Sequence, residues 1–296
     1  MWSGAIIRFS ECYERIDDMR RIRMTKTLWA RLLDMRRHNQ SAVNDGVDPV
    51  FSLYGPIAAA RHRFVLAQVG QSLDGRVATP FGDARDISGP EGIAHLHRCR
   101  ALVDAVIVGV GTVKADNPRL SVREVEGPDP VRVVIDCHGS LTGQEGLFHD
   151  NGAPVILIQA EGVAKKDHAA EVIRLPRNEN GICPRDILSA LEDRGLARIL
   201  VEGGARTIAR FIDHDLVDHL HVSVAPLIIG SGPAGISLPP IRTLSEAHRP
   251  SAAVYSLGSD ILFDCELKPT RIASSPRQRQ NIDVTDGAAA AIHDVV

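Results

Sequence analysis

The sequence lacks the features that mark secreted, membrane-spanning and nucleic-acid-binding proteins. Its five cysteines include no CxxC pair, which argues against a disulfide framework and against a cysteine-rich zinc site. No apolar run reaches the ~18 residues that a membrane helix needs, and charged residues interrupt the start of the chain, unlike in a signal peptide. The formal net charge of −3 gives no reason to expect a polyanionic partner. We therefore expect a cytoplasmic protein that binds neither membrane nor nucleic acid.

Aromatic residues are also scarce, at 4% of the 296 residues, although hydrophobic residues reach 44%. Val, Ile, Leu and Ala carry this apolar content, which favours an α/β domain with buried parallel strands. From residue 63 onward, short apolar runs alternate with helical patterns, and the last run alternates apolar with polar residues. The sequence predicts an α/β three-layer sandwich, with a mostly parallel central sheet and antiparallel strands near the C-terminus.

The chain divides into three regions. Residues 1–60 form an N-terminal extension, in which 25–37 has helical periodicity and 39–56 has the composition of a linker. Residues 61–268 hold the α/β pattern, and the polar, Ala-rich tail 269–296 is expected to be disordered. The role of the extension stays open; a helical arm that packs on the main domain or on a second subunit is one interpretation.

The stretch VIVGVGTVKADNPRLSVR, residues 106–123, runs from a predicted strand into a glycine turn. Gly109 and Gly111 match the start of a dinucleotide-binding GxGxxG loop, but Lys114 stands where the third glycine should be. Pro118 then ends any helix early, because proline disfavours helical backbone in the residue before it. The turn is therefore not a phosphate loop of that class.

The same turn carries polar groups that suit a binding site at the end of a parallel strand, where α/β sheets bind their ligands. Thr112 offers a hydroxyl, Asp116 a carboxylate and Arg123 a guanidinium that can hold phosphate. A tight surface loop with solvated charges is the alternative, and the spacing alone does not decide between the two.

A second glycine turn lies in LVEGGARTIARF, residues 200–211, between a predicted strand and a predicted helix. Backbone N–H groups at a helix start bind anions, and Gly203 and Gly204 remove side-chain bulk there. We interpret this turn as the site of a cofactor pyrophosphate, with Arg206 adding charge and Glu202 at the strand end. An ordinary strand-to-helix turn is the alternative. If both turns are functional, they converge at one edge of the sheet.

The characteristic segments of the chain are, in order, SLDGRVAT, RCRALVDAVIVGVGTVKADNPRLSVR, PVRVVIDC, ILVEGGARTIARFIDHDLVDHL and VAPLIIG. Together they resemble the reductase domain of riboflavin biosynthesis, over residues 63–267. The resemblance implies the fold of dihydrofolate reductase and a homodimer. It also implies NADPH-dependent reduction of a phosphoribosylamino-pyrimidine to the ribitylamino compound, with hydride transfer to C1′ of an imine.

The resemblance also assigns roles to individual residues. Asp116 and Glu202 are the carboxylates expected near the chemistry. The positions expected to bind the cofactor are Gln71, Gly109, Gly111, Thr112, Asp116, Gly203, Gly204, Ala205, Arg206 and Thr207. The positions expected to bind substrate are Arg100, Leu120, Arg123 and Glu202, and the two arginines suit its 5′-phosphate.

Two positions depart from the bacterial members of that family. Gln68 stands where they usually have lysine, and Asp86 where they have a tryptophan beside the nicotinamide. Because both positions are expected to border the pocket, two alternatives stay open. One is the same fold and cofactor acting on another pyrimidine, a pterin or a secondary-metabolite intermediate. The other is a paralogue that binds nucleotide without catalysis, although the polar residues retained in both turns argue against it.

Two further expectations concern a metal and a partner. His219 and His221 share one face of a predicted strand, but no third ligand is apparent, so we expect hydrogen-bonded or solvated histidines and no metal. The apolar strand within 221–230 would be costly to leave at an open edge of the sheet, which adds to the expectation of a homodimer.

Overall fold

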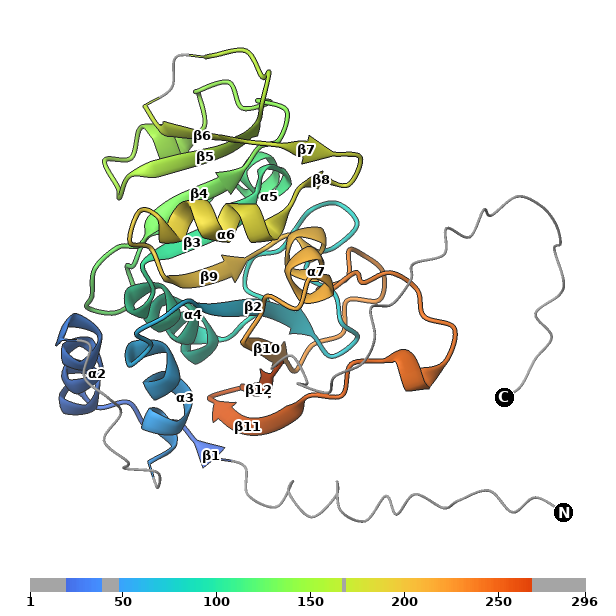
Figure 1. Cartoon of the computed structure of the whole chain (residues 1–296). Coiled ribbons are helices and arrows are strands. Elements are labelled where there is room, and N and C mark those ends of the chain that lie inside the picture. The colour runs from blue at the N-terminus through green and yellow to red at the C-terminus, as the bar shows by residue number, and fades with distance from the viewer. Residues whose placement is uncertain (1–19, 39–47, 167–168, 268–296) are drawn as a thin grey trace, which may run out of the picture.

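The computed structural model, shown in Figure 1, describes residues 20–38, 48–166 and 169–267. Its strands are β1 (Arg20–Arg21), β2 (Phe64–Ser72), β3 (Ala105–Gly109), β4 (Val131–Ile135), β5 (Val155–Ala160), β6 (Glu171–Leu175), β7 (Arg177–Asn178), β8 (Gly181–Ile182), β9 (Arg198–Glu202), β10 (His219–Ala225), β11 (Ser251–Leu257) and β12 (Asp260–Glu266). Its helices are α2 (Lys26–His38), α3 (Pro49–Ala58), α4 (Pro90–Leu102), α5 (Val110–Asp116), α6 (Pro184–Glu192) and α7 (Ala205–Asp213), with 3₁₀ turns at Gly146–Phe148 and Leu244–Glu246. Within the described ranges, no helix is both long and apolar enough to cross a bilayer.

The strands form one ten-stranded sheet in the order β1-β11-β12-β10-β2-β9-β3-β4-β5-β6, and β7 and β8 pair separately. From β10 to β6 every neighbouring pair is parallel, whereas β12 pairs antiparallel with both β10 and β11. The inner parallel strands are almost wholly buried, as strands covered on both faces must be. The predicted fold class is confirmed.

Alternate residues of the parallel strands contribute to two separate hydrophobic cores. On one face of the sheet, Leu66 and Leu200 belong to the core that includes residues of α2, α3 and α4. On the other face, Val65 and Val201 pack with residues of α6 and α7. The sheet is therefore the middle layer of a three-layer sandwich, as Figure 1 shows.

Helix α3 occupies residues 49–58, where the sequence predicted part of a linker. Asp48 caps this helix, because its carboxylate accepts a hydrogen bond from the N–H of Val50 at 2.8 Å. A glycine-proline pair near the C-terminal end gave the segment the composition of a linker. Burial of residues such as Tyr54, which is fully enclosed, stabilises the helix in spite of that pair.

Helix α2 confirms the helical prediction for residues 25–37. It packs on the main domain, where the indole Nε1 of Trp29 donates to the carbonyl oxygen of Glu126 at 2.7 Å. The described part of the N-terminal extension is thus attached to the main domain of its own chain. Residues 39–47 and the predicted tail 269–296 lie outside the described residues.

Strand β10 lies inside the sheet. One argument for a homodimer was that this apolar strand lies at an open edge, which a second subunit would cover. Strand β10 pairs with β2 on one side and with β12 on the other. The sequence did not reveal β11, whose pairing with β12 extends the sheet beyond β10. The expectation of an open apolar edge at this strand was therefore wrong, and the described sheet ends at β1 and β6.

Replacing Asp48 by alanine should lower the free energy of unfolding by about 1 kcal/mol, because the first turn of α3 loses its hydrogen-bond acceptor. The matched variant Asp48→Asn keeps a capping oxygen and should retain most of the stability. Urea unfolding followed by circular dichroism measures both. Equal losses in the two variants would show that the cap does not stabilise α3.

Candidate active site

Two adjoining cavities lie where the parallel strands β2, β3 and β9 end. The larger has a volume of about 900 Å³ and is lined by both glycine turns and by parts of the loop segments 77–84 and 233–237. The smaller, of about 270 Å³, extends toward α4. Thr112, Asp116 and Gly204 line both cavities, which therefore meet at these residues. Ligands of α/β sheets bind at such carboxyl ends of strands.

The two glycine turns touch each other. A Cβ on Gly203 would lie 3.2 Å from Cγ2 of Thr112, and a Cβ on Gly204 would lie 3.4 Å from its Oγ1. Both glycines have positive φ, at 65° and 74°, which other residues rarely adopt. On the other side, a Cβ on Gly109 would lie 2.7 Å from Oγ1 of Thr207. The expected convergence of the two turns at one edge of the sheet is confirmed.

A buried ion pair forms one wall of the smaller cavity. Arg100 donates from Nε and Nη2 to the two carboxylate oxygens of Glu202, both at 2.7 Å, and each side chain is 8% exposed. A further donor, Nη1, reaches the carbonyl oxygen of Ser121 at 3.0 Å. Burial disfavours the charged guanidinium, but the charge and hydrogen bonds of Glu202 outweigh it and raise the pKa of Arg100. Arg100 lines the smaller cavity and has two N–H donors beyond these three bonds, so the substrate contact that the sequence predicts does not require the pair to open.

Asp116 ends helix α5 at the junction of the two cavities. The next residue, Asn117, adopts left-handed backbone with φ of 42° and terminates the helix, which confirms the early stop predicted from the Asn-Pro pair. Partial burial raises the pKa of the Asp116 carboxyl. A carboxyl with a raised pKa keeps its proton to higher pH, which suits it to proton donation.

The predicted site residues divide according to the cavity that they line, and several of them line both. The larger cavity is lined by Gly109, Gly111, Thr112, Asp116, Gly204, Ala205, Arg206 and Thr207. The smaller cavity is lined by Arg100, Thr112, Asp116, Leu120, Glu202, Gly203, Gly204 and Ala205. Gln71 and Arg123 line neither of them. Arg123 is exposed and donates from Nη1 to Oγ of Ser121 at 2.9 Å.

The two departures from the family pattern lie in different surroundings. Gln68, on β2, is 6% exposed and lines the smaller cavity. Asp86 is exposed in a turn, with a positive φ of 59°, and lines neither cavity. The expectation that both positions border the pocket is therefore confirmed for Gln68 and wrong for Asp86, because this turn stays on the surface.

Two loop segments that sequence analysis did not assign to the site cover part of the larger cavity. The N–H of Val77 donates to the carbonyl oxygen of Pro233 at 3.0 Å, and Arg76 forms an isolated β-bridge with Ala234. These contacts bring together segments that are far apart in the chain. The turn SLDG, just before the first segment, is the sequence signal that could have pointed to them.

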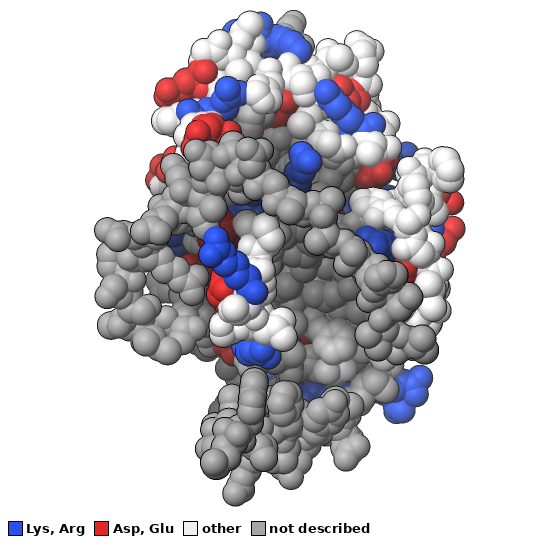
Figure 2. Space-filling model, turned by 90° about the vertical axis from the view of Figure 1, so that its right-hand side faces the viewer, with Lys and Arg blue, Asp and Glu red and all other residues white. Residues whose placement is uncertain are grey.

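Charged residues are mixed on the side of the molecule where β2 and β9 end. Figure 2 views the molecule from this side, and among its described residues Lys and Arg side chains lie between Asp and Glu side chains. A long polyanion binds where basic groups gather in a continuous stripe or patch. Among the described residues that are visible in this view, the basic side chains form no continuous stripe.

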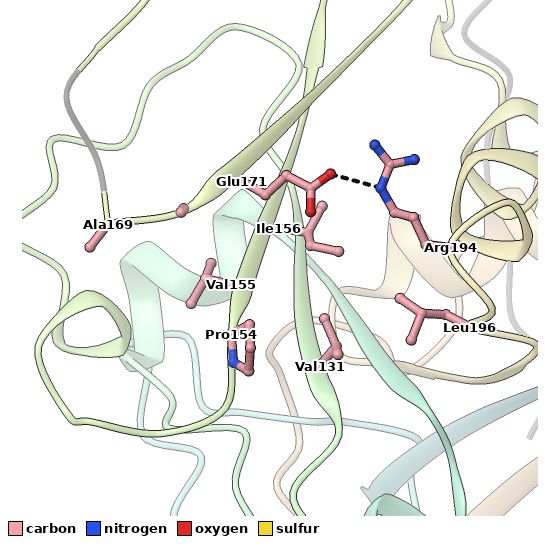
Figure 3. Close-up of a pocket in the computed structure, with 9 residues that line it drawn as sticks. Val131, Pro154, Val155, Ile156, Ala169, Glu171, Arg194 and Leu196 are labelled. Carbon is pink, nitrogen blue, oxygen red and sulfur yellow. Dashed lines mark hydrogen bonds and ion pairs between the residues drawn. The ribbon is translucent and has the colours of Figure 1, made fainter.

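A third cavity, of about 470 Å³, lies at the opposite edge of the sheet, where β4, β5 and β6 begin. Figure 3 shows Val155 and Ile156 in its lining and the ion pair in which Nε of Arg194 donates to Oε1 of Glu171 at 2.7 Å. It shares no lining residue with the other two cavities. Both charged residues are partly solvated and paired with each other, so this cavity adds no chemistry to the candidate site.

Comparison with known proteins places the chain in a family. The model of the RibD C-terminal domain matches residues 63–263. The chain belongs to this family. The fold agrees with this assignment. A similar solved structure is that of the Thermotoga maritima diaminohydroxyphosphoribosylaminopyrimidine deaminase/5-amino-6-(5-phosphoribosylamino)uracil reductase. It has a TM-score of 0.62 and 27% sequence identity, and the match covers 73% of this chain and 61% of that chain.

Relatives in the family differ in length. The 2,5-diamino-6-ribosylamino-4(3H)-pyrimidinone 5′-phosphate reductase of Methanothermobacter thermautotrophicus is 31% identical over 215 residues, which cover 69% of this chain and 98% of the relative. The riboflavin biosynthesis protein RibD of Bacillus amyloliquefaciens is 31% identical over 206 residues, which cover 67% of this chain and 56% of the relative. The chain thus spans nearly all of the Methanothermobacter reductase but about half of the Bacillus protein.

Replacing Arg100 by methionine should lower the free energy of unfolding by about 3–5 kcal/mol, because the buried Glu202 carboxylate loses its counter-ion. The double variant Arg100→Met/Glu202→Leu should recover most of this loss, since an apolar pair then replaces a buried ionic one. Urea unfolding measures all three proteins. Unchanged stability of the single variant would show that the pair does not form.

Proposed function

We propose that the protein is an NADPH-dependent reductase that converts a phosphorylated ribosylamino-pyrimidine to the ribitylamino compound. The observation that carries this proposal is the meeting of two cavities at Thr112, Asp116 and Gly204. The larger is within the range of ~300–1,000 Å³ that is common for ligand and cofactor sites. Membership of the RibD C-terminal domain family and the name of the Methanothermobacter relative support the substrate class.

The residues of the larger cavity fit a dinucleotide. Gly204 lacks the Cβ atom that would lie against Thr112, and the N–H groups at the start of α7 favour an anion such as pyrophosphate. Arg206 and Arg210 also line this cavity and add positive charge. The preference for NADPH over NADH rests on the family resemblance.

The residues of the smaller cavity fit a pyrimidine. Leu120 contributes apolar surface, while the amide of Gln68 can donate to and accept from a base edge. A carboxylate has about four lone-pair sites, so Glu202 keeps acceptors for the substrate after binding Arg100. The buried pair thereby holds Glu202 in one orientation toward the ligand.

Reduction adds one hydride and one proton across the C1′–N double bond of the ring-opened substrate and yields a secondary amine. Bound NADPH would supply the hydride. Asp116 donates the proton to the imine nitrogen, which makes C1′ a better hydride acceptor and leaves a carboxylate to be reprotonated from solvent. A positioned acid of this kind typically contributes ~10²–10⁴-fold to the rate.

A reductase with the same cofactor and a different substrate is the second candidate. The neutral amide of Gln68 in the smaller cavity favours it, because bacterial members usually have lysine there. A paralogue that binds nucleotide without catalysis is supported less well, since Asp116 remains at the junction of the cavities. Adding the ribosylamino-pyrimidine phosphate and following NADPH absorbance separates them, because tight NADPH binding without turnover would contradict the first proposal.

The variant Asp116→Asn should lower kcat by about 10²–10⁴-fold, because it removes the proton donor and keeps the side-chain volume. In the wild type, kcat/KM should fall as the pH rises through the raised pKa of Asp116, since only the protonated carboxyl donates. The variant should lack that decline.

Steady-state assays of NADPH consumption across pH measure both effects. Asp193→Asn, at the end of α6 and outside the lining of both cavities, is the matched control and should keep wild-type kinetics. A wild-type pH profile retained in Asp116→Asn would show that another group donates the proton.

A homodimer, which the resemblance implies, remains our proposal. Two large apolar side chains on neighbouring loops support it, since Leu73 is 61% and Ile228 75% exposed. The N–H of Leu73 donates to the carbonyl oxygen of Leu227 at 2.9 Å, which places these loops together. Neighbouring exposed apolar side chains mark protein interfaces.

The double variant Leu73→Asp/Ile228→Asp should shift the protein from dimer to monomer, because it would place carboxylates in an apolar interface. Light scattering of the wild type should give twice the chain mass of 32.1 kDa. A wild-type mass equal to one chain would contradict the dimer, and a variant that stays dimeric would place the interface elsewhere.

A further inference from the structure

A chain of buried polar side chains runs between helix α4 and strands β10 and β12. His95 and Cys99 on α4 and His221 on β10 are each at most 1% exposed. Tyr54 of α3 and Asp264 of β12 extend the chain at its two ends. None of these five residues lines the cavities of the candidate active site, so the proposed reduction gives them no role.

Three atoms of this cluster face one another. Nε2 of His95 lies 3.2 Å from Nδ1 of His221, and Sγ of Cys99 lies 3.6 Å from the first atom and 4.0 Å from the second. Tetrahedral zinc, with bonds of about 2.0–2.1 Å to nitrogen and about 2.3 Å to sulfur, separates neighbouring ligand atoms by about 3.3–3.6 Å. The triangle formed by the three atoms is therefore close to the size of one face of a zinc coordination tetrahedron.

The outer ring nitrogens of both histidines have partners. Nδ1 of His95 lies 2.8 Å from the hydroxyl of Tyr54, and Nε2 of His221 lies 3.4 Å from Oδ1 of Asp264. Histidines that bind metals almost always hold their second nitrogen in this way, with a carboxylate as a common partner, because the contact fixes the tautomer and the ring orientation. Each imidazole is thus oriented with one nitrogen toward Cys99 and the other toward a supporting group.

The geometry points to a site for a zinc-class divalent cation, and we propose that His95, Cys99 and His221 are its protein ligands. His95 and Cys99 are four residues apart on α4 and so share one helix face, which supplies the ligands that the sequence did not show beside His221. A thiolate with two imidazoles is a donor set that zinc prefers. Three protein ligands leave one position of the tetrahedron for a further ligand.

The charges of the cluster also fit a divalent cation. The Cys99 thiolate and the Asp264 carboxylate would offset much of its charge within the buried region, where an unbalanced ion would be costly, and Asp264 is shared with His219, whose Nδ1 lies 2.7 Å from its Oδ1. Because Cys99 directly precedes Arg100, the ion would fix α4 against β10 beside the residue that holds Glu202. The ion thus stabilises one wall of the smaller cavity without touching its ligand.

Cobalt titration of the full chain, after dialysis against a chelator, tests the site with Co²⁺ as a spectroscopic probe. The expected result is saturation at about one ion per chain, with the intense visible bands of tetrahedral cobalt and a thiolate-to-cobalt charge-transfer band, both removed by added zinc. Cys99→Ser should lose the charge-transfer band. Cys183→Ser, at the N-terminus of α6, is the matched control and should keep it.

Asp264→Asn should weaken cobalt binding about 10–100-fold and keep the charge-transfer band, as expected for a group that supports a ligand. A weak octahedral spectrum in the wild type, or an equal charge-transfer band in Cys99→Ser, would overturn the proposal and leave a hydrogen-bonded cluster without metal. If Cys99→Ser does not fold, the wild-type spectrum still decides between these outcomes. No readout depends on turnover, so the test is independent of the proposed reductase activity.

Discussion

The bidentate pair of Arg100 and Glu202 is the interaction on which the arrangement of the site depends. An ion taken out of water costs several kcal/mol unless a partner compensates it, so neither residue can leave the other without a large loss. The two bonds of 2.7 Å therefore fix α4 against the end of β9. The further bond from Arg100 to Ser121 holds the loop that carries Leu120 into the smaller cavity. One pair thus positions three separate parts of the wall.

The order of the strands explains why the two glycine turns meet. Strand β9 lies between β2 and β3 although it comes later in the chain, so the turns that follow β3 and β9 leave the sheet side by side. Their contact is close enough that side chains on Gly203 or Gly109 would press against threonine side chains of the opposite turn. The absence of side chains at these positions is therefore needed for the turns to pack, before any ligand is considered.

Local sequence signals predicted many of the helices and strands but not the long-range contacts between them. Apolar periodicity predicted the alternation of strands and helices from residue 63 onward but not β11, and the early end of α5 followed from an Asn-Pro pair. Helix α3 was missed because its stability comes from burial against the domain, which outweighs a glycine-proline pair. The engagement of Arg100 by Glu202 was missed because the two residues are 102 positions apart, and no local pattern encodes such a contact.

The position of Gln68 connects the active site with the histidine cluster. Asp264, His221, Gln68 and Glu202 are successive register partners on β12, β10, β2 and β9, and neighbouring strands lie about 4.8 Å apart. The family resemblance leads us to expect a lysine where this chain has Gln68. Because the Cys99 thiolate and the Asp264 carboxylate offset the charge of the proposed ion, the ion would add little net charge beside Gln68, and its effect there would be to hold β10 in register with β2. Gln68 is thus the strand position that lies between the proposed ion site and the Arg100–Glu202 pair.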